Sequence, residues 1–228
     1  MDTTLSGVRG LYAIVDVATL RARDLDPVAF AEAMIEGGAS TLQLRDKEGA
    51  GRSTLVLLEA IVALARPRGV PVYANDRVDL ALLAGASGVH LGQGDVDPAR
   101  ARALAERAAT RLALGRSTHD ERELRAALGE AIDYVAIGPV ASTSSKLDHE
   151  PVLGAREAAR LARLAREARP GLPRVAIGGV DPSLAVELAI DFDAVAVIGG
   201  LVPPDRGSLE GAKARARAYV RAFEGRGA

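Results

Sequence analysis

Several short apolar runs of this 228-residue chain are each followed by polar or charged side chains that could bind an anion. The second run, from Thr41 to Arg45, leads into the segment Gln-Leu-Arg-Asp-Lys. Because side chains along a strand alternate between its two faces, we expect Gln43, Arg45 and Lys47 on one side. An amide and two cations on one side predict a binding place for a multiply charged anion.

Two carboxylates follow the next two runs. Asp76 comes directly after the third run, and Asp95 comes a few residues after the fourth. Carboxylates from neighbouring strands can bind Mg²⁺ while water and substrate oxygens fill its other positions. Three cations, Arg45, Lys47 and Lys146, accompany them, and a monophosphate would not require so many charges. The set therefore predicts a metal-bridged diphosphate.

A second anion site is indicated after the last three runs. The hydroxyls of Thr143 and Ser145 follow the sixth run, and glycine pairs at 178–179 and 199–200 follow the seventh and eighth. Glycine leaves backbone N–H groups accessible, and such groups bind a phosphate monoester together with hydroxyls. The sequence therefore predicts a phosphate beside the diphosphate.

Eight apolar runs have the length and composition of buried parallel strands. They span residues 11–17, 41–45, 71–74, 88–91, 111–115, 134–138, 174–177 and 194–198. The segments between them predict helices, three of which begin with Asp-Pro, a capping carboxylate before a first-turn proline. The pattern predicts an α/β fold, a single (β/α)8 TIM barrel, with one domain over residues 1–228 and the polar residues at one rim. An open doubly wound sheet is the alternative, but the first turn lacks its glycine-rich dinucleotide fingerprint.

Composition limits the partners and the setting of the chain. Lysine and arginine number 29 against 30 Asp and Glu, a net charge of −1, so we expect no nucleic-acid or membrane partner. The absence of cysteine excludes disulfides and thiolate catalysis. No apolar run approaches the ~18 residues of a membrane span, and no signal pattern begins the chain, so we expect a cytoplasmic protein. The expected partners are phosphorylated small molecules, and a homo-oligomer remains open.

Six motifs occur in one order along the chain. They are Gln-Leu-Arg-Asp-Lys at 43–47, Asn-Asp at 75–76, His-Leu-Gly-Gln-Gly-Asp at 90–95, Ser-Thr-His at 117–119, Gly-Pro at 138–139 with Thr-Ser-Ser-Lys at 143–146, and Ala-Ile-Gly-Gly-Val at 176–180. Together they resemble the thiamine-phosphate synthase family from Leu11 to about Leu201. The specificity lies in the set, since each motif alone is common.

The resemblance implies a transferase of thiamine biosynthesis. It would join 4-amino-5-hydroxymethyl-2-methylpyrimidine diphosphate to 4-methyl-5-hydroxyethylthiazole phosphate, or to its carboxylated precursor, by Mg²⁺-assisted dissociative loss of diphosphate. By resemblance, the residues that hold the pyrimidine diphosphate are Gln43, Arg45, Lys47, Asn75, Ser117 and Lys146, and those that bind Mg²⁺ are Asp76 and Asp95. The residues implied for the thiazole phosphate are Thr143, Ser144, Ser145, Gly179, Ile198 and Gly199. The implied catalytic residues are Arg45, Lys47, Lys146 and Ser117.

Three positions depart from the family pattern. Gly199 stands where the family usually has Ser, Ser145 where it has Thr, and Ala141 where a larger residue is common. All three bear on the affinity for the thiazole phosphate more than on the diphosphate site.

Other functions remain alternatives. A related thiazole tautomerase would use His119 as its acid–base group, but it would have no diphosphate for Asp76 and Asp95 to bind. A non-catalytic phosphate-binding barrel would be favoured by the loss of Lys146 or Asp95, and neither is lost. Another phosphosugar barrel enzyme would use an early carboxylate such as Asp16, for which we expect a turn or charge-balancing role.

Two histidines have expected supporting roles. We expect His119 to support or cap its neighbours, and His90 to be a satisfied core or rim residue rather than a metal ligand. The histidines therefore carry less of the predicted chemistry than the carboxylates do.

Overall fold

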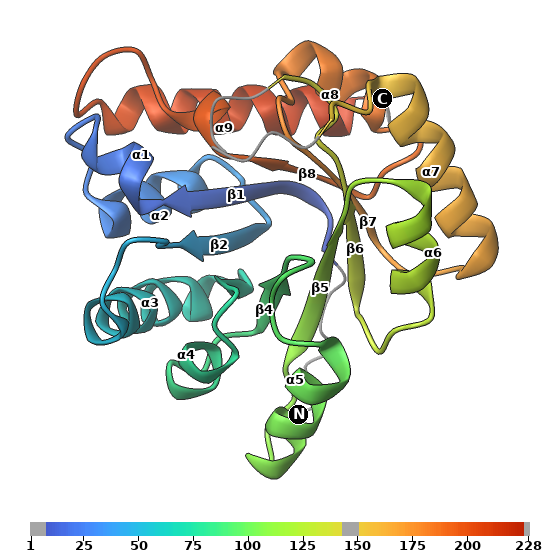
Figure 1. The fold of residues 1–228 in the computed structure, drawn as a ribbon. Coiled ribbons are helices and arrows are strands. Elements are labelled where there is room, and N and C mark those ends of the chain that lie inside the picture. Colours follow the sequence, from blue (N-terminus) through green and yellow to red (C-terminus); the bar gives the residue numbers. More distant parts are fainter. Residues whose placement is uncertain (1–7, 143–150, 226–228) are drawn as a thin grey trace.

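Eight parallel strands close into a barrel in the computed structural model, which describes residues 8–142 and 151–225. The strands are β1 (Gly10–Asp16), β2 (Thr41–Arg45), β3 (Val72–Asn75), β4 (Gly88–Leu91), β5 (Ala113–Thr118), β6 (Tyr134–Ile137), β7 (Arg174–Ile177) and β8 (Ala194–Val197). Each strand pairs with the next along the chain, and β8 pairs with β1 (Figure 1). The predicted (β/α)8 barrel is confirmed, and the open doubly wound sheet is wrong.

Helices follow the strands and surround the barrel (Figure 1). They are α1 (Val17–Arg21), α2 (Pro27–Glu36), α3 (Gly51–Ala65), α4 (Val78–Leu83), α5 (Pro98–Arg107), α6 (Glu121–Leu128), α7 (Ala155–Ala168), α8 (Pro182–Leu188) and α9 (Leu209–Glu224), with short 3₁₀ turns η1 (Arg66–Arg68) and η2 (Gly199–Leu201). The carboxylates of Asp26, Asp97 and Asp181 accept hydrogen bonds from first-turn N–H groups, so the three Asp-Pro starts are confirmed.

Two differences from the predicted strand boundaries bear on the site, whereas the boundaries of the other strands agree with the prediction to within one residue. β5 runs from Ala113 to Thr118 rather than over 111–115, so Ser117 and Thr118 lie buried within the strand instead of after it. β1 ends at Asp16, whose side chain caps α1 by accepting a hydrogen bond of 2.9 Å from the Thr19 N–H. In both places a polar residue belongs to the strand because it has partners inside the barrel or at its rim.

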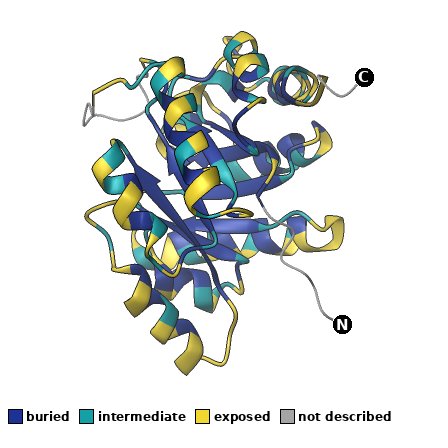
Figure 2. Cartoon of the chain, turned by 90° about the vertical axis from the view of Figure 1, so that its right-hand side faces the viewer, coloured by how far each residue is buried: buried dark blue, intermediate teal, exposed yellow. Residues whose placement is uncertain are grey.

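The apolar core has two parts. The larger part lies between the strands and the helices, where residues such as Phe30, Met34 and Leu161 are fully buried. Figure 2 shows the buried strands at the centre and the exposed faces of the helices outside. Among the described residues, no helix is both long and apolar enough to cross a membrane.

The second part fills the inside of the barrel and includes three tyrosines. The rings of Tyr12, Tyr73 and Tyr134 pack with centroids 5.5 to 6.0 Å apart. Glycine in the neighbouring strands makes room for them: a Cβ at Gly115 would lie 2.0 Å from Cζ of Tyr134, and one at Gly88 would lie 2.3 Å from Tyr73. The interior is therefore filled by large rings, and two of them, Tyr12 and Tyr134, contact each other through their hydroxyl groups at 3.0 Å.

Candidate active site

The carboxyl ends of β2 to β5 hold a group of the predicted site residues. These are Gln43 and Arg45 in β2, Lys47 just beyond it, Asn75 at the end of β3 with Asp76 next, Asp95 in the loop after β4, and Ser117 near the end of β5. The four predicted residues Thr143, Ser144, Ser145 and Lys146 lie outside the described residues. Parallel strands that end together place the first group at one rim of the barrel.

Three of these residues form one charged cluster. Lys47 makes a salt bridge with Asp76, and Asp76 lies within hydrogen-bonding reach of Asp95. Burial, followed by the hydrogen bond and the charge of Asp95, raises the pKa of Asp76 above its ordinary value, while Lys47 lowers it. When both carboxylates are ionised, the single lysine neutralises only one of their two negative charges. A divalent cation bound between them would balance the remaining negative charge.

The backbone holds both carboxylates in place. Asp76 has a positive φ of 64°, an unusual conformation for a residue other than glycine, and its N–H donates to the His90 carbonyl at 2.9 Å. Asp95 accepts a hydrogen bond of 2.7 Å from the Gly92 N–H. These two fixed carboxylates fit Mg²⁺, whose remaining positions water and phosphate oxygens can take. In the described part of the chain, no group of three or more His, Asp or Glu side chains suits a metal.

Arg45 has a partner that the sequence left open. It forms a salt bridge with Asp16, which is 4% exposed and lies opposite Arg45 in the pairing of β1 with β2. Asp16 therefore balances the charge of Arg45 and caps α1, as expected, and it is not the free carboxylate that a phosphosugar enzyme would use.

Gln43 and Ser117 are more deeply buried than the charged cluster. Gln43 Nε2 donates to the Tyr12 hydroxyl at 2.8 Å, and Gln93 Nε2 donates to the Ser117 carbonyl at 2.6 Å. His90 lies between the interior and the rim, with Nδ1 2.8 Å from the Tyr134 hydroxyl and Nε2 2.8 Å from Ser117 Oγ. The expectation that His90 is a satisfied core or rim residue is confirmed. The prediction of site residues did not include Tyr12, Tyr134 or Gln93.

Three of the residues predicted for the thiazole phosphate, Gly179, Ile198 and Gly199, lie at the ends of β7 and β8. Gly179 has a φ of 70°, and a Cβ there would lie 2.5 Å from the carbonyl oxygen of Ala141, so only glycine lets this turn approach the segment after β6. The Ala141 N–H donates to the Gly178 carbonyl at 2.9 Å. Ile198 follows β8 directly, and Gly199 begins η2 and is exposed.

His119 is held by the start of α6. Its Nδ1 lies 2.9 Å from Oε2 of Glu123, which also accepts a hydrogen bond of 3.0 Å from the His119 N–H. These contacts hold the ring of His119 against the first turn of α6 through Glu123, and its supporting role stays a prediction.

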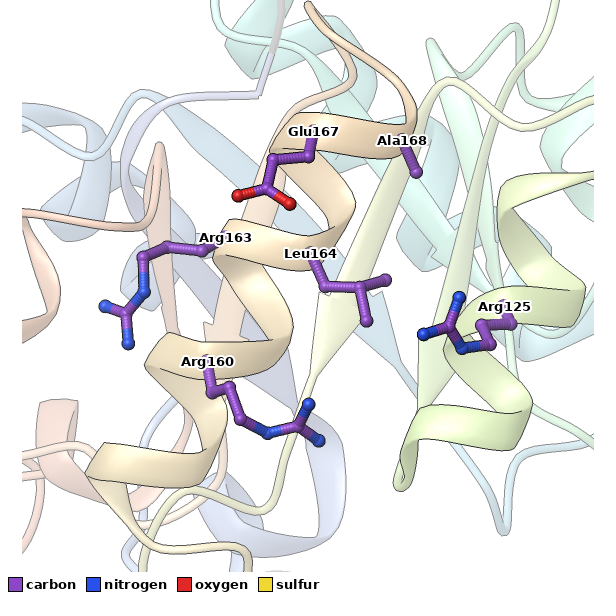
Figure 3. A pocket seen from close by; sticks show the side chains of 6 residues that line it. All are labelled: Arg125, Arg160, Arg163, Leu164, Glu167 and Ala168. Atoms are coloured by element: carbon purple, nitrogen blue, oxygen red, sulfur yellow. The ribbon is translucent and has the colours of Figure 1, made fainter.

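A separate hollow of about 570 Å³ lies on the outer helical layer between α6 and α7 (Figure 3). It is lined by Arg125, Arg160, Arg163, Leu164, Glu167 and Ala168. The arginines are already paired: Arg125 and Arg160 with Glu121, and Arg163 with Asp191. The hollow therefore offers little unbalanced charge and is not the predicted site.

A closed (β/α)8 barrel with cations and paired carboxylates at its carboxyl rim defines a class of enzymes that act on phosphorylated small molecules. The family model described as thiamine monophosphate synthase matches residues 11–201. The chain belongs to this family.

Individual relatives agree with this assignment. The thiamine-phosphate synthase of Koribacter versatilis is 35% identical over 86% of this chain and 90% of its own length, and that of Azorhizobium caulinodans is 38% identical over 75% and 76%. The solved thiamine phosphate pyrophosphorylase of Pyrococcus furiosus superposes with a TM-score of 0.80 at 26% identity, covering 96% of this chain and 97% of that one. A tryptophan synthase structure from Mycobacterium tuberculosis, at 18% identity and a TM-score of 0.65, shares the fold alone.

Proposed function

We propose that this chain is a thiamine-phosphate synthase, a transferase that condenses the pyrimidine diphosphate with the thiazole phosphate and releases diphosphate. The family membership supports this reaction. The observation that carries the proposal in the structure is the cluster of Lys47, Asp76 and Asp95. A tautomerase would have no use for such a pair of carboxylates, because it has no diphosphate for them to bind.

The diphosphate group binds at the ends of β2 to β5 in this proposal. The side chains that hold the pyrimidine diphosphate are Gln43, Arg45, Lys47, Asn75, Ser117 and Lys146. Asp76 and Asp95 would hold Mg²⁺, the ion that members of the family typically use. When bound there, Mg²⁺ supplies positive charge to the leaving diphosphate oxygens.

The side chains of the rim promote departure of the leaving group. The bond between the pyrimidine methylene carbon and the diphosphate oxygen breaks, and its electron pair leaves with the diphosphate. Lys47 and Arg45, together with Lys146, stabilise the negative charge that develops on that oxygen. The thiazole nitrogen then donates its lone pair to the methylene carbon and forms the new C–N bond, so no side chain has to accept a proton.

The thiazole phosphate binds on the other side of the same mouth. Gly179, Ile198 and Gly199 contribute backbone N–H groups, and Thr143, Ser144 and Ser145 contribute hydroxyls. An anchor for the second substrate places its nitrogen near the methylene carbon before the diphosphate leaves. This positioning lowers the entropic part of the barrier.

One assay with omitted components tests the proposal. Purified protein is incubated with the pyrimidine diphosphate, the thiazole phosphate and Mg²⁺, and both thiamine phosphate and released diphosphate are quantified. We expect equal amounts of the two products and a requirement for every component. Isomerisation of the carboxylated thiazole without the pyrimidine, or no coupled product at all, would contradict the proposal.

A further inference from the structure

A continuous chain of hydrogen bonds crosses the inside of the barrel beneath the mouth. Gln43 Nε2 lies 2.8 Å from the Tyr12 hydroxyl, which lies 3.0 Å from the Tyr134 hydroxyl. The Tyr134 hydroxyl lies 2.8 Å from His90 Nδ1, and His90 Nε2 lies 2.8 Å from Ser117 Oγ. All five side chains are buried. The chain therefore joins two residues of the proposed pyrimidine site that lie on β2 and β5.

The donors and acceptors give this chain a direction. Gln43 Nε2 can only donate, so the Tyr12 oxygen accepts from it. Either hydroxyl could donate in the bond between Tyr12 and Tyr134, and we assign the donor as Tyr12, because its single proton then has an acceptor. With this assignment, the Tyr134 proton is donated to His90 Nδ1. If Tyr134 donated to Tyr12 instead, the Tyr12 oxygen would accept hydrogen bonds from both Gln43 and Tyr134, and the Tyr12 proton could not be donated to Tyr134.

The last link fixes the state of His90 and the proton of Ser117. A neutral imidazole that accepts at Nδ1 carries its proton on Nε2, and that proton is donated to Ser117 Oγ. The Ser117 proton is therefore not used in this link and is available for another acceptor. Ser117 is the second-to-last residue of β5. Its hydroxyl therefore lies at the carboxyl end of the strand, beside the mouth of the barrel.

The surroundings keep the tyrosine hydroxyls protonated and in place. Burial raises the pKa of Tyr12 and of Tyr134 far above the ordinary value, so both hydroxyls remain donors. Gly115 provides the space for the Tyr134 ring, because a Cβ at this position would lie 2.3 Å from the Tyr134 hydroxyl oxygen.

We infer that Tyr12, Tyr134 and His90 are positioning residues that turn the Ser117 hydroxyl toward the mouth, where it donates to an acceptor atom of the pyrimidine diphosphate. The role in the reaction rests on the proposed function. The direction of the chain and the tautomer of His90 rest on the hydrogen bonds and on the assignment of their donors, and not on the reaction.

Nitrogen NMR on protein labelled at histidine tests the direction of the chain without any substrate. The signal of His90 is identified by its loss in His90→Asn and is recorded at a pH at which the ring is neutral. We expect the tautomer with the proton on Nε2, and we expect Tyr134→Phe to reduce this preference. A proton on Nδ1 in the unaltered protein would overturn the inference, whatever reaction the enzyme catalyses.

Steady-state kinetics of two matched variants test the effect on the substrate. Tyr134→Phe removes one hydroxyl from the chain, whereas Tyr73→Phe removes a hydroxyl from the same group of packed rings without breaking any of the four links. We expect Tyr134→Phe to lower kcat/KM for the pyrimidine diphosphate about tenfold, the effect of one hydrogen bond, with the KM for the thiazole phosphate unchanged. Tyr73→Phe should match the unaltered enzyme.

The kinetics, the unfolding control and the NMR result together distinguish a positioning role from a folding defect and from a wrong proposed function. Equal kinetics in the two variants, or equal losses for both substrates, would overturn the positioning role. Thermal unfolding of both variants shows whether a loss of activity reflects folding. An unaltered enzyme that makes no thiamine phosphate but shows the Nε2 tautomer would contradict the proposed function and leave the chain direction supported.

Discussion

At the scale of single residues, Asp76 is the side chain whose surroundings say most about the site. It is partly buried, lies beside a second carboxylate and pairs with Lys47. Its pKa is raised because burial and Asp95 both disfavour its charge, and a lysine that is 52% exposed offsets this only in part. A bound divalent cation would remove this cost, so metal binding and the ionisation of Asp76 are linked.

Binding of Mg²⁺ should therefore depend on pH. The pKa of Asp76 is higher in the folded protein than in the unfolded chain. The metal-free protein therefore loses stability as the pH rises from the unfolded pKa to the folded pKa, because the folded state then has to release the proton of a carboxyl that is costly to ionise. Protons and Mg²⁺ compete for Asp76, so the stabilisation by Mg²⁺ should decrease as the pH falls below the raised pKa. Thermal unfolding with and without Mg²⁺ across this pH range measures the effect. The same increase in Tm at every pH would contradict the linkage, and Asp76→Asn serves as the control without the titrating group.

Substitution of Asp95 tests whether the diphosphate site and the thiazole phosphate site are distinct. Asp95→Asn keeps an oxygen for the Gly92 N–H but removes the charge, so the loop should remain in place while Mg²⁺ binding is lost. We expect turnover to fall by roughly 100-fold or more, the scale of one electrostatic contribution to a transition state. Binding of the thiazole phosphate, measured by calorimetry, should stay nearly unchanged. Loss of both would mean that the two sites are not distinct.

The chemical types at the site could be predicted from the sequence, but their partners could not. Gln43 and Arg45 lie at the end of one apolar run, Asp76 and Asp95 follow two others, and the fold places such residues at one rim. The contact between Tyr12 and Tyr134 joins residues that are 122 positions apart, so no local pattern indicates it. Only the glycines within β4 and β5 gave a local signal that bulky side chains lie beside them.

At the scale of elements, the ends of the strands were the least predictable feature. Caps are local, so Asp26, Asp97 and Asp181 marked the starts of helices correctly. The end of β5 depends on partners from other strands, since Ser117 lies opposite Ala136 of β6 and contacts His90 of β4. A polar residue in that position looks like the start of a loop when only the sequence is considered.

The fit between β5 and β6 gives a prediction at this scale. Gly115→Ala would place a Cβ 2.0 Å from Cζ of Tyr134, so the ring or the strand has to move. We expect a loss of about 1–3 kcal/mol in the free energy of unfolding, as for other overpacked cores. Gly94→Ala is the matched control, because a Cβ there meets no atom within 4 Å. Similar free energies of unfolding for the two variants, determined by denaturant titration, would argue against a tightly filled interior.

At the scale of the whole molecule, closure of the barrel links the two ends of the chain. β1 pairs with β8, and α9 packs against both α2 and α8 (Figure 1). The two proposed anion sites therefore combine early and late parts of the sequence, and neither half of the chain carries both of them.

We propose that residues 1–228 form a single domain, and this proposal predicts how the molecule unfolds. Strands that all depend on closure should be lost together, so calorimetry should show one transition with equal calorimetric and van't Hoff enthalpies. Far-UV circular dichroism should report the same midpoint. Two separate transitions would indicate two independently folded parts.

The most direct test of the central claim is a crystal structure with inorganic diphosphate and Mn²⁺, which replaces Mg²⁺ and gives an anomalous signal. The account predicts one strong anomalous peak between the carboxylates of Asp76 and Asp95, with diphosphate oxygens bound to the ion and Lys47 turned toward them. A diphosphate and metal ion bound elsewhere on the molecule, or no peak between these two carboxylates at saturating concentrations, would contradict it.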